Sequence, residues 1–288
     1  MFDEEHSADV VAASFGATPD ERLKEILTSL VRHAHAFVKD VGLTTEEWTA
    51  GIRFLTETGQ KCDATRQEFI LLSDVLGVSM LVETINNRAE DGGTESTVEG
   101  PFHMVASPPR ALGDSIDLVG NGEPCLVTGR VVDTAGRPVG GASVDVWQAD
   151  ADGFYDVQRP DEVPRQNLRG RFTADADGRF HFRTVVPRFY PIPTDGPVGR
   201  LLGATRRHPN RAAHIHLEVS APGIRTLTTH LFVDGSPYLD SDAVFGVKES
   251  LIREFAPVDD PARAAGLGLP NPFRAVDFPI VVQPAAAG

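Results

Sequence analysis

A change in hydrophobic periodicity near residue 92 divides this chain into two parts. Before it, apolar residues recur at helical spacing over long stretches. After it, short apolar runs alternate with polar residues and are separated by turns rich in glycine and proline. The polar, glycine-containing segment "NNRAEDGGTESTVEGPFH" lies between the two patterns. We therefore expect a helical domain over residues 1–92 and a second domain of β-strands over residues 93–288.

The first part predicts three helices, each with a start signal. Their segments read "TPDERLKEILTSLVRHAHAF", "TTEEWTAGIRFL" and "TRQEFILLSDVLGVSMLVETI". In each segment a threonine is followed three residues later by a glutamate, which is the pattern of a capping box. The three pairs are Thr18–Glu21, Thr44–Glu47 and Thr65–Glu68.

The second part predicts an antiparallel β-sandwich, so the fold class is α+β. Alternating apolar residues flank the turn "DTAGRP", and "GRFTADADGRFHFRTVVP" indicates a hairpin that bends at Asp175 to Gly178. Two further strands flank "APG" at residues 221–223. Small binding and spacer modules share such patterns, so the sandwich alone says nothing about chemistry.

A pair of histidines lies on one of these predicted strands, in "RAAHIHLEV". Residues two apart on a strand face the same way, so His214 and His216 share one face and Ile215 and Leu217 share the other. Two adjacent imidazoles suit a metal ion. An exposed strand edge that carries two histidines explains the pattern equally well.

Two of the chain's three tyrosines lie upstream of this pair, where predicted strands give way to loops. Tyr155 ends "DADGFY", and Tyr190 lies in "VPRFYPIPTDGPVG". Pro191 biases the backbone of Tyr190 towards an extended conformation. Each tyrosine taken alone could also anchor its loop through burial of the ring.

These motifs together resemble the intradiol ring-cleaving dioxygenases, non-haem iron(III) enzymes of the catechol 1,2-dioxygenase type. The resemblance rests on "DGFYDVQ", "VPRFYPIPTDGPVG", "RAAHIH" and "SAPGIRTLTTHLFVDGSPYLDSD", and it extends to "TESTVEGPFH" and the helical part. It implies one Fe(III) per subunit. The ligands that it implies are Tyr155, Tyr190, His214 and His216.

The types of these four residues suit ferric iron. A free tyrosine has a pKa of about 10, so a phenolate at neutral pH needs a strong Lewis acid. Zinc sites use mostly Cys, His and carboxylate, and ferrous oxygenases use two His and one carboxylate. Glu218 lies on the histidine face and would permit that ferrous triad. Neither a ferrous triad nor the zinc site of a hydrolase explains the two tyrosines.

The resemblance also implies a reaction. An ortho-diol binds the iron through both oxygens, Tyr190 leaves the metal and takes a proton, and O2 attacks the ring. The ring then breaks between the two oxygenated carbons and gives a muconate-type diacid. Arg211 matches an arginine that stabilises negative charge developing on the ring. Without the motif, Arg211 would be interpreted as a surface arginine beside a strand.

Within the family the chain is most similar to the hydroxyquinol 1,2-dioxygenase branch, which implies cleavage of benzene-1,2,4-triol to 3-hydroxy-cis,cis-muconate (maleylacetate). The alternatives are a catechol or chlorocatechol 1,2-dioxygenase and, outside enzymes, a sandwich-type binding protein with a vestigial site. Asp74 suits a third ring hydroxyl, unless it lies on the exposed face of its helix. His230 stands where the catechol enzymes carry a glutamine. The substrate-binding positions implied are Leu71, Asp74, Val98, Gly100, His230, Ala243 and Val244.

Charge and composition limit the partners. A formal net charge of −14 argues against nucleic acid and anionic membranes. No apolar run approaches the roughly 20 residues that span a bilayer, and we see no secretion signal. We expect Cys62 and Cys125 to be free thiols in a reducing, cytoplasmic compartment. The resemblance implies a homodimer formed through the helical domain, with a bound phospholipid in some members.

Overall fold

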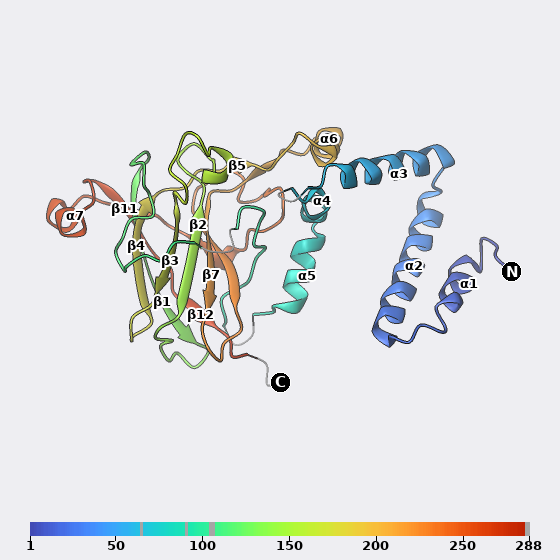
Figure 1. The fold of residues 1–288 in the computed structure, drawn as a ribbon, viewed down its shortest axis with the longest axis horizontal. Helices are drawn as coiled ribbons and strands as arrows, with labels where there is room; N and C mark the ends of the chain where they lie inside the picture. The colour runs from blue at the N-terminus through green and yellow to red at the C-terminus, as the bar shows by residue number, and fades with distance from the viewer. Residues whose placement is uncertain (64–65, 90–91, 104–106, 286–288) are drawn as a thin grey trace. The chain divides into compact units, whose positions relative to one another are not determined.

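The computed structural model describes residues 1–63, 66–89, 92–103 and 107–285. By contacts the chain forms two compact units, residues 1–57 and residues 58–288, and each is described by itself (Figure 1). The domain boundary near residue 92 stays a prediction. The two compact units meet at residue 58 and not near residue 92, because the helices over residues 68–86 belong to the second unit.

The first unit consists of helices. They are α1 (Ser7–Ser14), α2 (Glu21–Val41) and most of α3 (Thr45–Gln60). The capping box of α3 is confirmed: Thr44 N donates to Glu47 Oε2 at 3.0 Å, and Glu47 N donates to Thr44 Oγ1 at 3.2 Å. For α2 the predicted box is wrong, because Asp20 caps the helix instead and accepts from two backbone N–H groups. Helix α1, which packs on α2, was not predicted.

The predicted third helix is two helices, α4 (Glu68–Val75) and α5 (Val78–Asn86). The break falls at Gly77, whose φ of +73° is in the left-handed region that favours glycine. The start signal at Thr65 lies outside the described residues. Glu68 is fully buried, and its Oε1 accepts from Val198 N at 3.1 Å in the first turn of α6 (Pro197–Ala204).

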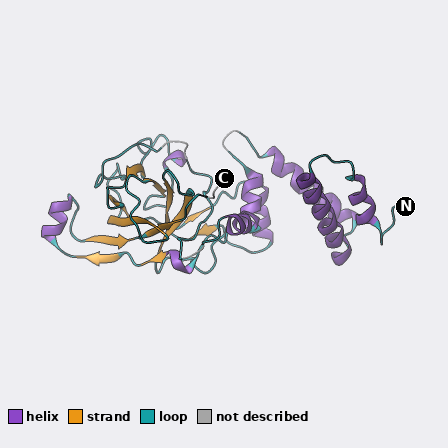
Figure 2. Ribbon diagram, turned by 90° about the horizontal axis from the view of Figure 1, so that it is seen from below, coloured by secondary structure: helices purple, strands orange, loops and turns teal. Residues whose placement is uncertain are grey.

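The rest of the second unit contains two five-stranded sheets (Figure 2). The first has the order β10–β11–β1–β12, and β4 also pairs with β1. Its strands are β1 (Pro124–Asp133), β4 (Arg179–Val185), β10 (Ala256–Val258), β11 (Phe273–Asp277) and β12 (Ile280–Val282). The second has the order β3–β2–β7–β8–β9. Its strands are β2 (Ser143–Gln148), β3 (Arg169–Thr173), β7 (His214–Ser220), β8 (Leu227–Val233) and β9 (Ile252–Arg253).

The pairing differs from the predicted pairing in two respects. The hairpin expected around Asp175 to Gly178 is wrong, because β3 pairs with β2 in one sheet and β4 pairs with β1 in the other. The sheets are also mixed, since β1 runs parallel to β11 and β12, and β8 runs parallel to β9. The α+β class and the antiparallel β7–β8 pair are confirmed.

Apolar side chains from both sheets form one core. Phe172 on β3 and Phe182 on β4 stack with ring centroids 5.2 Å apart, and Ile215 and Leu217 on β7 belong to the same cluster. The core takes one face of β7, as the alternation predicted. The histidines are therefore left on the other face, away from the core.

Among its described residues, the unit also contains two 3₁₀ helices, one further helix and a small two-stranded sheet. The 3₁₀ helices are η1 (Asp156–Gln158) and η2 (Glu249–Leu251), and the helix is α7 (Pro261–Leu267). The small sheet pairs β5 (Tyr190–Pro191) with β6 (Asn210–Arg211). It lies in the loops that carry several of the predicted site residues.

Candidate active site

The histidine pair lies in the middle of a sheet. Strand β7 pairs with β2 on one side and with β8 on the other, and both imidazoles are 1% exposed. The alternative of an exposed strand edge is therefore wrong. Trp147 on β2 stacks against His216, with ring centroids 4.7 Å apart and planes 11° apart. This stacking restricts rotation of the His216 ring.

Loops next to the sheet bring both tyrosines to the histidines. Tyr155 follows β2 and begins η1, where its backbone N–H donates to Gln158 Oε1 at 2.8 Å. Tyr190 lies in β5, directly opposite Arg211 in β6. The two tyrosine rings meet edge to face with centroids 5.3 Å apart. Both rings are at least 98% buried, as those of loop anchors would also be. Their hydroxyls distinguish them, because Tyr155 Oη lies 3.1 Å from His216 Nε2 and Tyr190 Oη lies 3.4 Å from Arg211 Nη1.

Three of the four predicted ligands meet through their polar atoms. His214 Nε2 lies 3.1 Å from His216 Nε2, which lies 3.1 Å from Tyr155 Oη. Neighbouring donors around one cation are about 3 Å apart when each is about 2.1 Å from it, so these separations suit a shared metal. Tyr190 Oη joins the group through Arg211 Nη1, which is 3.4 Å from Tyr190 Oη and 3.3 Å from His214 Nε2.

Protonation also fits a metal centre. His214 Nδ1 is 2.7 Å from the carbonyl oxygen of Ala212, which can only accept, so Nδ1 carries the proton and Nε2 offers a lone pair. Burial and the charge of Arg211 lower the pKa of His214 well below its usual value, and the ring is therefore neutral. Burial and the neighbouring Tyr190 raise the pKa of Tyr155 well above 10. A phenolate here therefore needs a cation.

Arg211 is buried beside these groups, so the interpretation as a surface arginine is wrong. Its exposed fraction is 2%, and its Nε donates to Asp242 Oδ1 at 3.2 Å. Burial lowers the pKa of the guanidinium, but Asp242 and the two tyrosines outweigh this and raise it above its usual range. Arg211 therefore brings a permanent positive charge into the site, balanced by a buried carboxylate.

Asp74 faces the interior, so its placement on an exposed helix face is wrong. It is 7% exposed, and burial raises the pKa of its carboxyl. A hydrogen bond to Ser79 and the charge of Arg211 act in the opposite direction, which places the carboxyl within the field of the site. Leu71, one turn earlier on α4, is buried as well.

The other predicted substrate positions come from two loops and β8. Gly100 has φ +79°, and a Cβ there would lie 3.2 Å from His216 Cε1, so the backbone passes close to this edge of the ring. Val98, two residues earlier, is half-buried. His230 is fully buried, and its Nε2 lies 2.8 Å from His216 Nδ1.

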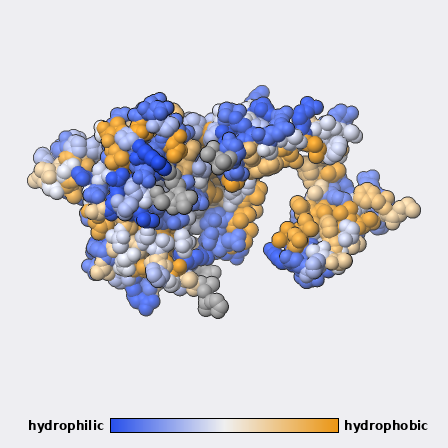
Figure 3. All heavy atoms as spheres, viewed as in Figure 1, coloured by the Kyte–Doolittle hydropathy of each residue, from blue (hydrophilic) through white to orange (hydrophobic). Residues whose placement is uncertain are grey.

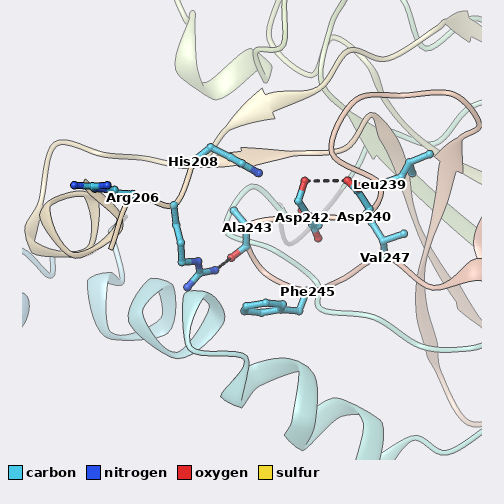
Figure 4. A pocket seen from close by; sticks show the side chains of 10 residues that line it. Arg206, His208, Leu239, Asp240, Asp242, Ala243, Phe245 and Val247 are labelled. Carbon is cyan, nitrogen blue, oxygen red and sulfur yellow. Dashed lines mark hydrogen bonds between the residues drawn. The ribbon is translucent and has the colours of Figure 1, made fainter. Parts of the chain in front are cut away.

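Ala243 and Val244 lie in the loop that follows Asp242, and both are buried. Ala243 N donates to Asn210 O at 3.1 Å, which holds this loop against β6. On the Ala243 side lies a pocket of about 480 Å³, lined by ten residues including Arg207 (Figure 4). Arg207 donates to the carbonyl of Ala243 at 3.0 Å. Of the predicted substrate positions, only Ala243 lines this pocket.

Glu218 does not lie with the histidine site. It is half-buried, and its carboxylate lies within 4.8 Å of ligand atoms of Glu99 and His103. The ferrous triad of two histidines and this glutamate is therefore not assembled among the described residues. Instead His230 joins His214 and His216 as a third imidazole.

The sequence interpretation missed several supporting residues. Arg169, 1% exposed, donates from Nε to Asp156 Oδ1 at 2.8 Å and from Nη1 to the carbonyl of Phe102 at 2.8 Å. The ring of Phe102 stacks on Tyr155 with centroids 4.5 Å apart. Arg169 therefore links the residue that follows Tyr155 to the residue that stacks on its ring. In the sequence, the acidic Asp156 next to Tyr155 was the sign of such a partner. Its burial becomes evident only from the structure.

Comparison with known proteins identifies the family. The family model "Dioxygenase" matches residues 99–284, and the model "Catechol dioxygenase N terminus" matches residues 20–94. This chain belongs to the intradiol ring-cleavage dioxygenases. Members of that family are generally iron-dependent, which agrees with the possible metal site at the buried histidines.

Several of the similar proteins are hydroxyquinol 1,2-dioxygenases. The hydroxyquinol 1,2-dioxygenase of Rhizobium sp. (strain MTP-10005) is 53% identical, over 98% of this chain and 96% of the relative. The solved hydroxyquinol 1,2-dioxygenase of Pseudomonas putida DLL-E4 is 52% identical with a TM-score of 0.92, over 98% and 99% of the two chains. The catechol 1,2-dioxygenase of Acinetobacter radioresistens is 27% identical with a TM-score of 0.84, over 99% and 94%.

Proposed function

We propose that this intradiol dioxygenase cleaves hydroxyquinol, benzene-1,2,4-triol, with O2 between the adjacent hydroxylated carbons. The product is 3-hydroxy-cis,cis-muconate, which is maleylacetate in its keto form. The observation that carries the substrate is the buried carboxylate of Asp74 in the field of Arg211. The identity of 45% to 53% to hydroxyquinol 1,2-dioxygenases, against 41% to a catechol 1,2-dioxygenase, supports the same substrate.

The metal in this proposal is Fe(III), one per subunit. Its ligands are Tyr155, Tyr190, His214 and His216. The close approach of the buried donor atoms supports this set. When bound, Fe(III) would act as a Lewis acid that draws electron density from the chelated diol and so makes the ring reactive towards O2.

The chain's own groups manage protons and charge. Tyr190 Oη takes a proton from one substrate hydroxyl. Arg211 Nη1, 3.4 Å away, donates to this oxygen in both its phenolate and its phenol form. The guanidinium then stabilises negative charge as it develops on the ring. It is suited to this because Asp242 fixes its position and the guanidinium itself is buried.

Asp74 recognises the third hydroxyl, the one that catechol lacks. A carboxylate in a buried wall accepts a hydrogen bond from a phenolic O–H and so recovers part of its desolvation cost. Burial raises the pKa of Asp74, and a hydrogen bond accepted from the substrate O–H would stabilise its ionised form. Leu71, Val98, Gly100, Ala243 and Val244 would line the remaining wall.

The deciding experiment is steady-state kinetics on hydroxyquinol, catechol and chlorocatechols, with iron content measured on the same preparation. We expect a red-brown protein, one iron per subunit, and the highest kcat/KM for hydroxyquinol. A higher kcat/KM for catechol or chlorocatechol would select the alternative enzymes. A colourless protein that takes up no iron after ferric reconstitution would leave only a binding protein with a vestigial site.

We also propose a homodimer formed through the helices, with a phospholipid bound between them. Apolar side chains of α2 and α3 are exposed, and Figure 3 shows hydrophobic atoms at the surface of these helices. They are Leu23, Ile26, Leu30, Phe37, Val38, Val41, Trp48, Ile52 and Leu55. Apolar faces of this extent mark interaction surfaces.

We place the protein in the cytoplasm and give it no nucleic-acid partner. The two cysteines are free thiols, and Cys125 is fully buried. The net charge of −14 disfavours polyanions. Among the described residues no helix is long and apolar enough to cross a bilayer.

A further inference from the structure

The two histidines of the centre differ in what holds their second nitrogen. Nδ1 of His214 meets the carbonyl of Ala212, at 2.7 Å. Nδ1 of His216 meets a third imidazole, Nε2 of His230, at 2.8 Å. His230 lies on β8 directly opposite His216 on β7, and it is fully buried.

This difference matters for the direction of the lone pairs. A carbonyl only accepts, so it fixes the tautomer of His214 unconditionally. An imidazole nitrogen either donates or accepts, so the tautomer of His216 depends on that of His230. His216 Nε2 offers a lone pair towards Tyr155 and His214 only when its own Nδ1 carries the proton and His230 Nε2 accepts it.

The rest of the His216 environment sets the plane of the ring and leaves its protonation open. Trp147 stacks on one side at 4.7 Å, and the backbone of Gly100 passes close to Cε1. His230 Nδ1 is buried and, among the described residues, has no hydrogen-bond partner. A bare Nε2 on His216 requires His230 Nε2 to accept at 2.8 Å, and His230 then carries its own ring proton on the unpartnered Nδ1.

We propose that His230 is a positioning residue that holds His216 with Nδ1 protonated and Nε2 bare towards the donor cluster. It acts through His216 and not by touching the metal or the ring of the diol. This rests on the proposed function in one respect, namely that His216 Nε2 is an iron ligand. Partners of this kind on a ligand histidine commonly change metal affinity by 10- to 100-fold.

The test compares His230→Gln with His230→Leu in the full-length protein. Glutamine keeps an oxygen that accepts from Nδ1–H, whereas leucine is close in volume and cannot accept. Thr228→Val is the matched control, because Thr228 lies on the same strand opposite Glu218 and away from His216. The first readout is the tautomer of His216 in metal-free, 15N-labelled protein, measured by long-range 1H–15N NMR.

We expect Nδ1 of His216 to be the protonated nitrogen in the wild type, in His230→Gln and in Thr228→Val. In His230→Leu we expect the proton on Nε2 in a large fraction of molecules. The second readout is iron affinity by competition with a chelator. It should fall about 10- to 100-fold in His230→Leu and only a few-fold in His230→Gln.

The outcomes separate this proposal from the proposed function. If the wild type binds iron while His216 carries its proton on Nε2 in the metal-free protein, the positioning role is overturned. Equal iron affinity in His230→Leu and wild type overturns it too. If the wild type binds no iron, the proposed function fails, and the NMR result still decides the role of His230. Should His230→Leu not fold, the wild type and His230→Gln spectra decide it.

Discussion

The contacts of Arg211 indicate its proposed role most directly. Its guanidinium is buried, paired with Asp242, and within 3.4 Å of both Tyr190 Oη and His214 Nε2. We expect Arg211→Lys to lower kcat about 100-fold, because a point charge cannot keep the same fixed donors at a developing negative charge. Iron content should stay near one per subunit. Arg206→Ala, an exposed arginine nearby, serves as control; a kcat unchanged in Arg211→Lys would contradict the role.

Asp74 gives a prediction about specificity. We expect Asp74→Asn and Asp74→Ala to lower kcat/KM for hydroxyquinol about 10-fold or more while changing that for catechol much less. The reason is that only hydroxyquinol has the hydroxyl that Asp74 would accept. The measurement is the ratio of the two kcat/KM values, with Asp40→Ala on α2 as an exposed control. Equal losses for both substrates would refute specific recognition.

At the scale of single residues, the sequence predicted the site where a residue type by itself indicates metal binding. Two histidines on one strand face and two tyrosines in recognisable motifs could be assigned from the sequence alone. Asp242 and Arg169 could not, because a charged residue becomes informative only once its burial and its partner are known. His230 was placed near the site, but its contact with His216 follows from the β7–β8 register, which the sequence does not specify.

At the scale of elements, helix α4 begins with a buried carboxylate, Glu68, that we expect to be important for stability. Glu68 is 0% exposed, pairs with Arg66, and accepts from Val198 N at the start of α6. We expect Glu68→Ala to lower the free energy of unfolding by about 3 kcal/mol, since it leaves a buried cavity and unpaired groups. Urea unfolding measures this, with Glu46→Ala on α3 as the exposed control. A loss as small as that of the control would show that the pair is dispensable.

Element prediction succeeded where local chemistry decides and failed where tertiary structure does. The Thr44–Glu47 box formed because both partners are local to one helix start. The hairpin at Asp175 to Gly178 did not form, because the turn residues fit equally well a connection between the two sheets. Likewise Gly77 interrupts an apolar pattern that continues through it, so periodicity alone gave one helix in place of two.

For the whole molecule, the three buried imidazoles predict a dependence of stability on pH. Burial, reinforced by neighbouring positive charge, lowers the pKa of His214, His216 and His230 well below 6.5. The unfolded chain therefore binds these protons before the folded chain does, so stability is fully present above about pH 6.5 and falls as the pH drops. Three such groups give a slope of up to about 4 kcal/mol per pH unit.

The measurement is the urea midpoint of metal-free protein from pH 8 to pH 5.5. His230→Gln should reduce the slope by about a third, and His33→Gln, which removes an exposed histidine, should leave it unchanged. A midpoint that does not move over this range would mean that the folded site takes up protons as readily as the unfolded chain.

The exposed helical faces give a prediction about assembly. We expect the wild type to sediment as a dimer and the double variant Leu30→Glu, Ile52→Glu to sediment as a monomer. Both residues are about half exposed or more, so charges there should not unfold the single chain. Analytical ultracentrifugation tests this, with Arg53→Glu as a charge-matched control on α3. A double variant that stays dimeric would remove these faces from the interface.

The parallel pairing of β1 with β11 and β12 has a consequence for synthesis. All four predicted iron ligands leave the ribosome before either partner strand of β1 on that edge has been made. During translation one edge of β1 therefore stays unpaired until residues 273–282 have been made. A ribosome stalled after residue 260 would hold a chain that contains all four donor residues and lacks both β11 and β12.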